Sequence, residues 1–311
     1  MRKITLIFLV LAMHFGTVSL AQSIDTVTNV NQDTVKLWKK SFNAGINLNQ
    51  ASFSDNWKAG GVNSIGVNTH LNYRALYEKN RMSWDNAFEF LYGFVNLSDQ
   101  SPSFRKTNDR IFLDSKVGYD LNDNWELFGA MNFQTQFANG FQYERVGGLD
   151  TDEERLISGF LSPAFITTSW GFQYEVEKFF RLRLSPFSPR ITIVRNENVS
   201  INVPENYGVP IGETVRYEWL AFQMMADFDK DIAENLNLKF RYLMFANYEV
   251  LDFNTIDHRL DITITAKVNR FLNVNLGAIV LYDIDQDAAV QFSQALSIGI
   301  AYTFKNFEDK K

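Results

Sequence analysis

The feature that most constrains this chain is the two-residue periodicity of residues 290–304. One face of this stretch is apolar except for Gln294, and it consists of Val290, Phe292, Leu296, Ile298, Ile300, Tyr302 and Phe304. The residues between them are small or polar. Such alternation is typical of a β-strand with one apolar and one wet face. The end of the chain therefore predicts a half-buried strand.

The same pattern recurs along the chain and predicts about eleven further strands. The expected segments are 39–49, 63–77, 81–95, 110–119, 124–137, 158–174, 179–194, 214–228, 235–248, 256–268 and 271–282. Pro186 and Pro189 cannot donate ladder hydrogen bonds, so we expect a bulge or interruption in the seventh strand. In the eighth segment the phase is ambiguous, and its faces are not assigned.

The connections between these segments alternate between long and short. Long links are expected at 50–62, 96–109, 138–157 and 195–213, whereas most of the others have two to six residues. An even number of strands with short turns at one end and long loops at the other is typical of outer-membrane barrels. Aromatic residues gather at the short-turn end, as in the interfacial girdle of such barrels. The fold class predicted is all-β: a transmembrane, antiparallel, up-and-down β-barrel of about twelve strands.

The N-terminus predicts export from the cytoplasm. Residues 1–21 combine a basic start, an apolar run at 4–13 and small residues before Gln22, which is the pattern of a secretory signal peptide cleaved near Ala21. The polar residues 22–37 are expected to form a disordered lead-in, and 38–304 the barrel domain. The predicted location is the outer membrane of a Gram-negative cell.

Composition excludes several classes of function. Removing the two basic residues of the signal leaves 28 basic and 36 acidic residues, which is a net charge of −8. This balance and the lack of a run of basic residues argue against a nucleic-acid partner. The chain has no cysteine, which excludes disulfides and thiolate metal sites. We expect no cofactor and no metal.

Residues 297–304 resemble the C-terminal targeting signal of outer-membrane β-barrels, which carries a glycine, two further residues and then two aromatics around any residue. Gly299, Tyr302 and Phe304 fill these positions. The resemblance implies that barrel-assembly machinery recognises this strand during insertion, and that the strand closes the barrel against the first one. The polar tail at 305–311 departs from the pattern, because the second aromatic usually ends the chain.

A wider resemblance spans about residues 38–304. It is carried by the segments 57–64, 158–163, 184–186, 190–194, 245–248 and 281–283. These segments are similar to those of an uncharacterised, domain-of-unknown-function family of Gram-negative outer-membrane β-barrels. The resemblance implies the fold and the location, and it implies no active site.

The inward faces of the expected strands carry the charged candidates for function. They are Arg74, Glu89, Asp114, Lys116, Glu126, Arg181, Arg183, Lys239, Arg241, Arg259, Asp261 and Lys267. We hypothesise that the lumen is basic along one wall and acidic to mixed along the other, which would give a narrow, weakly anion-biased pore. The alternative is that these charges pair across the interior and plug it. Twelve strands lie between the filled and the open barrels, so both readings stay open.

Other candidate sites are weaker. A lipid hydrolase would need a base beside its nucleophile. The mature chain offers only His70, expected to face inward, and His258, expected to face lipid. The alternating carboxylates of residues 283–287 begin like a calcium loop, but Ala288 stands where that loop needs glycine and no glutamate follows at the twelfth position. We interpret them as a solvated turn.

These observations predict an outer-membrane barrel that acts as a narrow, porin-like channel for small solutes and is not an enzyme. The alternative function is a non-conducting barrel that serves as a partner in envelope assembly or secretion, and a lipid hydrolase is a remote third. Expected partners are outer-membrane lipid and lipopolysaccharide, which divalent cations could bridge to the acidic loop at 150–154, and possible envelope-complex proteins.

Overall fold

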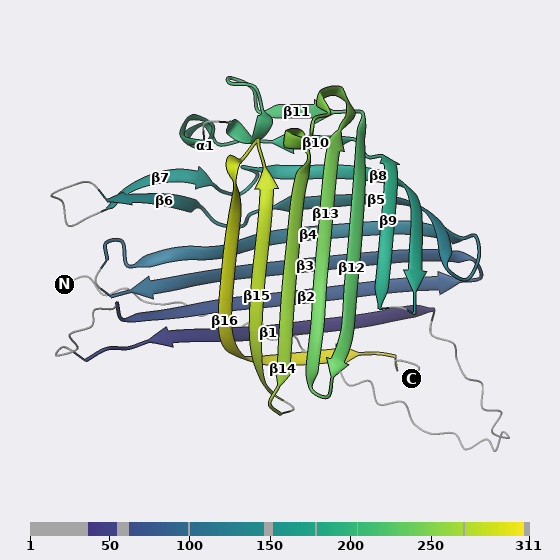
Figure 1. The fold of residues 1–311 in the computed structure, drawn as a ribbon, viewed down its shortest axis with the longest axis horizontal. Helices are drawn as coiled ribbons and strands as arrows, with labels where there is room; N and C mark the ends of the chain where they lie inside the picture. The colour runs from purple at the N-terminus through teal and green to yellow at the C-terminus, as the bar shows by residue number, and fades with distance from the viewer. Residues whose placement is uncertain are drawn as a thin grey trace, which may run out of the picture. The chain divides into compact units, whose positions relative to one another are not determined.

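Strand pairing closes the chain into a single barrel. The computed structural model describes residues 37–54, 62–98, 100–145, 152–177, 179–203, 205–269 and 271–307. Several predicted features lie outside these residues. They are the signal peptide, all of the lead-in but its last residue, residues 55–61 of the expected link at 50–62, Asp150 of the acidic loop and the end of the tail. Within them, twelve antiparallel strands form a closed ring (Figure 1). The predicted fold class is confirmed.

The ring follows the order of the chain. It runs through β1 (Trp38–Ala51), β2 (Ser64–Lys79), β3 (Met82–Leu97), β4 (Phe104–Asp120), β5 (Trp125–Thr135), β8 (Ala164–Val176), β9 (Phe180–Phe187), β12 (Ala221–Ala233), β13 (Leu236–Asn247), β14 (Asp257–Lys267), β15 (Leu272–Asp283) and β16 (Asp287–Lys305). Each strand pairs with its neighbours in this order, which is the up-and-down topology.

The last strand closes the ring as the sequence predicts. β16 pairs with β1 from Ser41 opposite Lys305 to Leu48 opposite Ile298. In Figure 1 the yellow β16 ribbon first follows β15 and then turns to run beside β1. A ring removes the unpaired edges that an open sheet would expose to lipid, which is why spanning sheets close.

Two strands are interrupted near the long-loop end. β9 ends at Phe187 and resumes as β10 (Arg190–Ile193), and β12 is preceded by β11 (Val215–Glu218). Pro189 lies in the first gap, where the missing N–H costs no ladder bond, so the predicted interruption is confirmed. Across the second gap the inward face changes from even to odd residue numbers, which explains the ambiguous phase of the eighth predicted strand.

Two predicted loops contain more strand than expected. β4 begins at Phe104, six residues before its predicted start. The prediction missed residues 104–109 because they are mainly polar and show no alternation of apolar and polar side chains. The loop at 138–157 forms a separate hairpin of β6 (Gly140–Arg145) and β7 (Asp152–Ser158). The start of the predicted sixth strand is different: Ser158 ends β7, and residues 159–163 form a tight turn with a bridge between Gly159 and Ser162.

The outward face of the ring is apolar. Its exposed side chains include Ile46, Leu113, Leu127, Met131, Phe172, Phe292, Leu296, Ile298 and Ile300. At the short-turn end aromatic rings meet, with ring centroids 5.2 Å apart in Trp38 and Tyr77 and 4.9 Å apart in Trp125 and Tyr174. An apolar band bordered by aromatic side chains is the lipid-facing surface of a transmembrane barrel.

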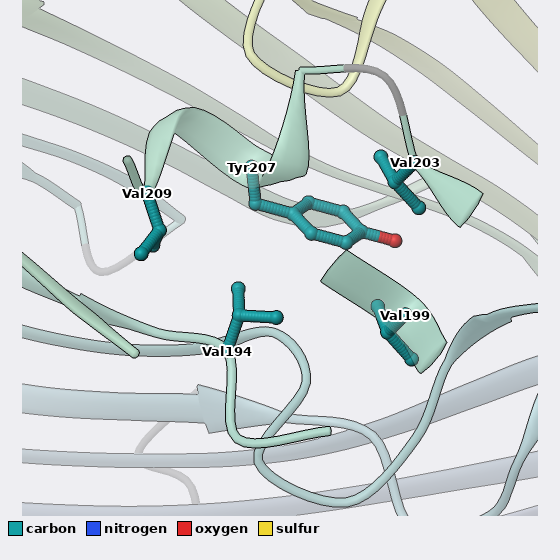
Figure 2. Close-up of a cluster of buried hydrophobic side chains, with 5 residues drawn as sticks. All are labelled: Val194, Val199, Val203, Tyr207 and Val209. Atoms are coloured by element: carbon teal, nitrogen blue, oxygen red, sulfur yellow. The ribbon is translucent and has the colours of Figure 1, made fainter. Parts of the chain in front are cut away.

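The long-loop end carries a small hydrophobic core of its own. Helix α1 (Glu197–Asn202) and the short helix η1 (Asn206–Gly208) follow β10, and Val194, Val199, Val203, Tyr207 and Val209 pack together there (Figure 2). The Tyr207 hydroxyl donates to the Ile157 carbonyl oxygen at 2.6 Å, which ties this core to β7. Burial raises the pKa of Tyr207 to about 12.

The remaining helical turns, η2 (Tyr248–Val250) and η3 (Phe253–Thr255), connect β13 to β14. Among the residues that the structure describes, no helix is both long and apolar enough to cross a membrane.

Candidate functional site

The inward face of the ring collects the charged residues that the sequence singles out. The strand registers place on this face Arg74, Glu89, Asp114, Lys116, Glu126, Arg181, Arg183, Lys239, Arg241, Arg259, Asp261 and Lys267. In a two-sided strand this arrangement follows from alternation alone. Alternation does not show which of these charged residues meet across the barrel.

An ion pair between Arg241 and Glu89 crosses the whole lumen. The Arg241 Nη1 lies 3.0 Å from Glu89 Oε1, and its Nε donates to Asp227 Oδ1 at 2.7 Å. β13 and β3 are separated by five strands in either direction around the ring, so this contact joins opposite walls. Arg110 and Asp261, also on opposite strands β4 and β14, approach to 3.8 Å. The two walls are therefore in direct contact at this level.

Other charged pairs fill the half of the lumen toward β5 and β9. Arg183 donates to Asp114 at 2.9 Å and to the Gln173 amide oxygen at 3.1 Å. Lys116 pairs with Glu126. Further pairs join Arg74 to Asp85 at 2.6 Å, Arg181 to Asp85 at 3.9 Å and Arg259 to Asp261 at 2.8 Å. The cations of the predicted basic wall are thus largely matched by carboxylates.

Three charged residues of this network are absent from the predicted set. They are Asp85, Arg110 and Asp227. Asp85 follows from the phase of its strand, since it lies on the same face as the predicted inward residue Glu89, four residues further on. Arg110 was placed at a strand start, and Asp227 lies in the strand whose phase was ambiguous. Alternation along the sequence does not indicate the face of Asp227, because the strand is interrupted between Glu218 and Ala221.

One row across β13 to β16 stays open. Lys239 lies opposite Thr263, Thr263 opposite Gly277, and Gly277 opposite Ala295. All four face inward, and the side chains of Lys239, Thr263 and Ala295 are exposed. A Cβ atom built on Gly277 would meet no atom within 4 Å. This row borders open space beside the ion-paired cluster.

A cavity of about 300 Å³ lies toward the long-loop end of the lumen. Its charged lining consists of Arg110, Arg190, Arg259, Asp109, Asp257 and Asp283. Arg190 pairs with Asp257 at 2.7 Å, so the charges of this wall are balanced. Its apolar lining consists of Phe112, Phe165, Met225, Leu243, Phe245, Ile279 and Leu281. Pore interiors in such barrels are usually polar, so the apolar half of this lining is a specific feature of the chain.

The predicted assembly residues lie where β16 meets β1. A Cβ atom on Gly299 would stand 1.8 Å from Asn47 Oδ1, so a larger residue there would displace the Asn47 amide, which accepts a hydrogen bond from Asn275 at 3.0 Å. Tyr302 and Phe304 project outward, opposite Ala44 and Phe42, and both are exposed. The strand runs one residue past Phe304. Asn306 then accepts a hydrogen bond from the Lys40 N–H at 2.7 Å and donates to the Trp38 carbonyl at 3.1 Å.

The two histidines occupy separate places. His70 faces inward, and its Nε2 lies 2.9 Å from Asn43 Oδ1. His258 faces outward, where the Tyr242 hydroxyl approaches its Nδ1 to 2.7 Å. In the described part of the chain, neither imidazole is hydrogen-bonded to a serine or threonine hydroxyl.

The carboxylates after β15 form a tight, bonded turn. Asp283 is buried and accepts hydrogen bonds from the Asp285 N–H at 3.0 Å and the Gln286 side chain at 2.5 Å. Asp285 pairs with Arg216 at 2.6 Å. The interpretation as a solvated turn is therefore wrong for Asp283, whose bonds fix the turn. Among the described residues no group of three or more His, Cys, Asp or Glu is placed to hold a metal ion.

Comparison with known proteins finds a family without an assigned activity. Residues 48–141 match the model of a family described as a protein of unknown function (DUF3078). This match agrees with the resemblance drawn from the sequence. None of the curated proteins matches the chain.

Solved structures with similar architecture are distant. The outer membrane channel COG4313 from Pseudomonas putida F1 is 11% identical with a TM-score of 0.39, over 90% of this chain and 100% of that one. The translocator domain of autotransporter NalP from Neisseria meningitidis is 10% identical with a TM-score of 0.38, over 88% and 90%. Outer membrane phospholipase A from Escherichia coli is 9% identical with a TM-score of 0.41, over 86% and 93%. The fold assignment therefore rests on this chain's own strand pairing.

Proposed function

We propose that this barrel resides in the outer membrane and provides a narrow passage for small solutes along its β13–β16 wall. The observation that carries the proposal is the open row of Lys239, Thr263, Gly277 and Ala295. Small and exposed inward residues leave room there, next to the Arg241–Glu89 pair, whereas further ion pairs fill the half of the lumen toward β5 and β9. A wide diffusion pore is not compatible with walls that touch through Arg241 and Glu89.

The charge of the passage favours anions. Among the ion pairs of the described residues, Lys239 and Lys267 have no carboxylate partner, although both face the lumen and are exposed. An unpaired cation beside a narrow pathway attracts anions and repels cations. Arg241 and Arg183 contribute less to this field, because carboxylates neutralise them at close range.

Conductance of the purified protein in planar bilayers tests the proposal. We expect small discrete steps, and a reversal potential in a KCl gradient that indicates chloride preference. Lys239→Gln should lower that preference about twofold, as expected for removal of one lumen charge. The matched control is Lys230→Gln, since Lys230 is an exposed β12 lysine whose ammonium contacts the Phe179 ring. The absence of steps above baseline would overturn the passage.

A second function is favoured by the ordered long-loop end. The β6–β7 hairpin and the core around Val199 form a layer that a simple pore does not need. Together with the crossing ion pairs, this layer supports a non-conducting barrel that serves as a partner in envelope assembly or secretion. Affinity purification from detergent extracts separates the two functions, because a passage is recovered alone whereas a partner brings a stoichiometric second protein.

Export and insertion belong to the same proposal. The signal peptide at 1–21 would direct export, and barrel-assembly machinery would recognise Gly299, Tyr302 and Phe304, with lipid and lipopolysaccharide around the finished barrel. The proposal assigns no catalytic role, because hydrolysis needs a base within reach of a hydroxyl nucleophile, and His70 contacts an asparagine.

A further inference from the structure

The cavity of about 300 Å³ lies between two unlike walls of the lumen. Asn132 and Gln134 of β5 line one side, and Ile279 and Leu281 of β15 line the other. β5 and β15 are six strands apart in either direction around the ring, so these two walls face each other across the lumen. The cavity therefore has a polar wall and an apolar wall on opposite sides.

The two carboxamides of the polar wall are available to a bound molecule. Asn132 is only 8% exposed, and in the described part of the chain neither its side chain nor that of Gln134 is hydrogen-bonded to another residue. A buried polar group without a partner is costly, and a solute that bonds to it removes this cost. Each carboxamide offers two N–H donors and a carbonyl acceptor. This wall can therefore bind either a hydroxyl or a carbonyl group of a solute.

The apolar wall consists of aliphatic side chains that remain partly exposed inside the lumen. Leu243 of β13 and Leu281 of β15 lie on either side of Arg259 in the strand register, and Ile279 follows in the next inward position of β15. Arg259 turns along its own strand to pair with Asp261 at 2.8 Å. All three aliphatic side chains line the cavity and are partly exposed. Covering this surface with an apolar group of a solute is favourable.

The charged groups of the lining are already matched with one another. Arg190 pairs with Asp257 at 2.7 Å, and its guanidinium lies 3.2 Å from the centre of the Phe245 ring. The Nε atoms of Arg110 and Arg190, which have no partner among the described residues, are buried away from the open space. A charged solute would have to displace one member of a pair and leave the other without compensation. The cavity therefore favours an uncharged solute. The other bonded groups are Arg110 with Glu89, Arg259 with Asp261, Asp109 with Lys106, and Asp283 with the Gln286 side chain.

We propose that this cavity binds a small, uncharged, amphipathic molecule. Its apolar part lies against Ile279 and Leu281, and its hydroxyl or carbonyl group lies at Asn132 and Gln134. An apolar cavity of about 150 Å³ holds benzene, so a cavity of about 300 Å³ takes a molecule of one or two rings. This volume is at the small end of known ligand pockets. The site goes beyond the proposed passage, because binding at equilibrium does not require an open lumen.

Equilibrium dialysis of 2-naphthol against the protein in phospholipid nanodiscs tests the site. This two-ring alcohol is uncharged at neutral pH, and empty nanodiscs of the same lipid measure its partition into the bilayer. We expect saturable binding above that background. 2-Naphthoate, which replaces the hydroxyl by a charged group, and naphthalene, which lacks the hydroxyl, should each bind at least fivefold more weakly. The absence of saturable 2-naphthol binding, or equal binding of 2-naphthoate, would overturn the site.

Two substitutions test the orientation of the bound molecule. Leu281→Asn should weaken the binding of 2-naphthol and naphthalene alike by at least fivefold, whereas Asn132→Leu should weaken only that of 2-naphthol. The matched controls are Leu91→Asn and Asn72→Leu, which make the same exchanges at inward positions of β3 and β2 outside the cavity lining and should change binding less than twofold. Gln134→Leu replaces Asn132→Leu if the heat-dependent mobility on gels shows that the latter does not fold. Unchanged binding in the variants of both walls would overturn the site, whereas a lack of chloride conductance would count only against the passage.

Discussion

At the scale of single residues, the contact between Arg241 and Glu89 defines the interior. The two side chains are about one-fifth exposed, at 20% and 18%, so solvent screens them little. Ion pairs of this kind add modest stability as a unit, because desolvation offsets their attraction. Removing one partner is different, since it leaves the other charge without compensation in a poorly solvated place.

Glu89→Gln should therefore destabilise the barrel by about 3 kcal/mol, the lower end of the range for breaking a buried pair. The substitution leaves Arg110 with only its longer contact to Asp261 at 3.8 Å, and Arg241 with Asp227 alone. Urea unfolding in lipid vesicles measures the change. The control is Glu78→Gln, which removes an exposed pair with Lys39 and should cost less than about 1 kcal/mol. Equal losses from the two variants would contradict a structural role for the crossing pair.

The sequence predicted which charged residues point inward, but not their partners. Alternation assigns a face to Arg183 or Asp114 from local spacing, whereas their 2.9 Å contact depends on the curvature of the whole ring. For the same reason the sequence left the open and the plugged lumen undecided. The inward apolar residues Leu243, Phe245, Ile279 and Leu281 had no sequence signal, because apolar residues on both faces of a strand remove the alternation.

At the scale of elements, periodicity identified the membrane-facing strands and missed those beyond the membrane. β6 and β7 are rich in charged residues and have no lipid-facing side, so their pairing leaves no trace in hydrophobicity. Only one of the two strand interruptions is indicated by the sequence. Pro189 marks the gap between β9 and β10 in the sequence, whereas the gap after β11 falls at Trp219 and Leu220, which are ordinary strand formers.

The final strand permits a prediction about assembly. Phe304→Ala should lower the amount of folded barrel in outer membranes several-fold, because it removes an outward aromatic side chain from the closing pair with Phe42. Deleting residues 308–311 should have no effect, since the bonds that fasten the strand end come from Asn306. The measurement is the heat-dependent mobility shift of membrane fractions on gels.

Phe253→Ala is the control for loss of an exposed aromatic ring, as Phe253 lies in η3 with 89% of its surface exposed. Normal assembly of the Phe304→Ala variant would mean that the targeting signal lies elsewhere. The structure also refines the predicted tail: deletion from residue 305 would remove Lys305 and Asn306, which contact β1, so only the shorter deletion isolates the end of the chain.

At the scale of the whole molecule, the barrel is a ring with one incomplete joint. Eleven of its joints follow chain order between successive strands, whereas the twelfth must bring the two ends of the domain together. β2 is paired with β3 along its entire length and with β1 from Ser64 to Tyr77. β16 is paired with both neighbours only from Ile298 to Ile300; residues 301–305 pair with β1 alone and residues 291–297 with β15 alone. Opening of the ring should therefore begin along residues 291–297 of β16, which pair only with β15.

Hydrogen exchange followed by mass spectrometry tests this order of stability. Amides within residues 291–297 that point away from β15 have no acceptor in the strand ladders of the described residues, so they should exchange within seconds to minutes in lipid nanodiscs. The peptide covering β2 should stay protected for hours, because each of its ladder amides has a partner. Equal protection of the two peptides would contradict an unpaired edge on β16, since a fully paired ring leaves no amide of β16 more accessible than those of β2.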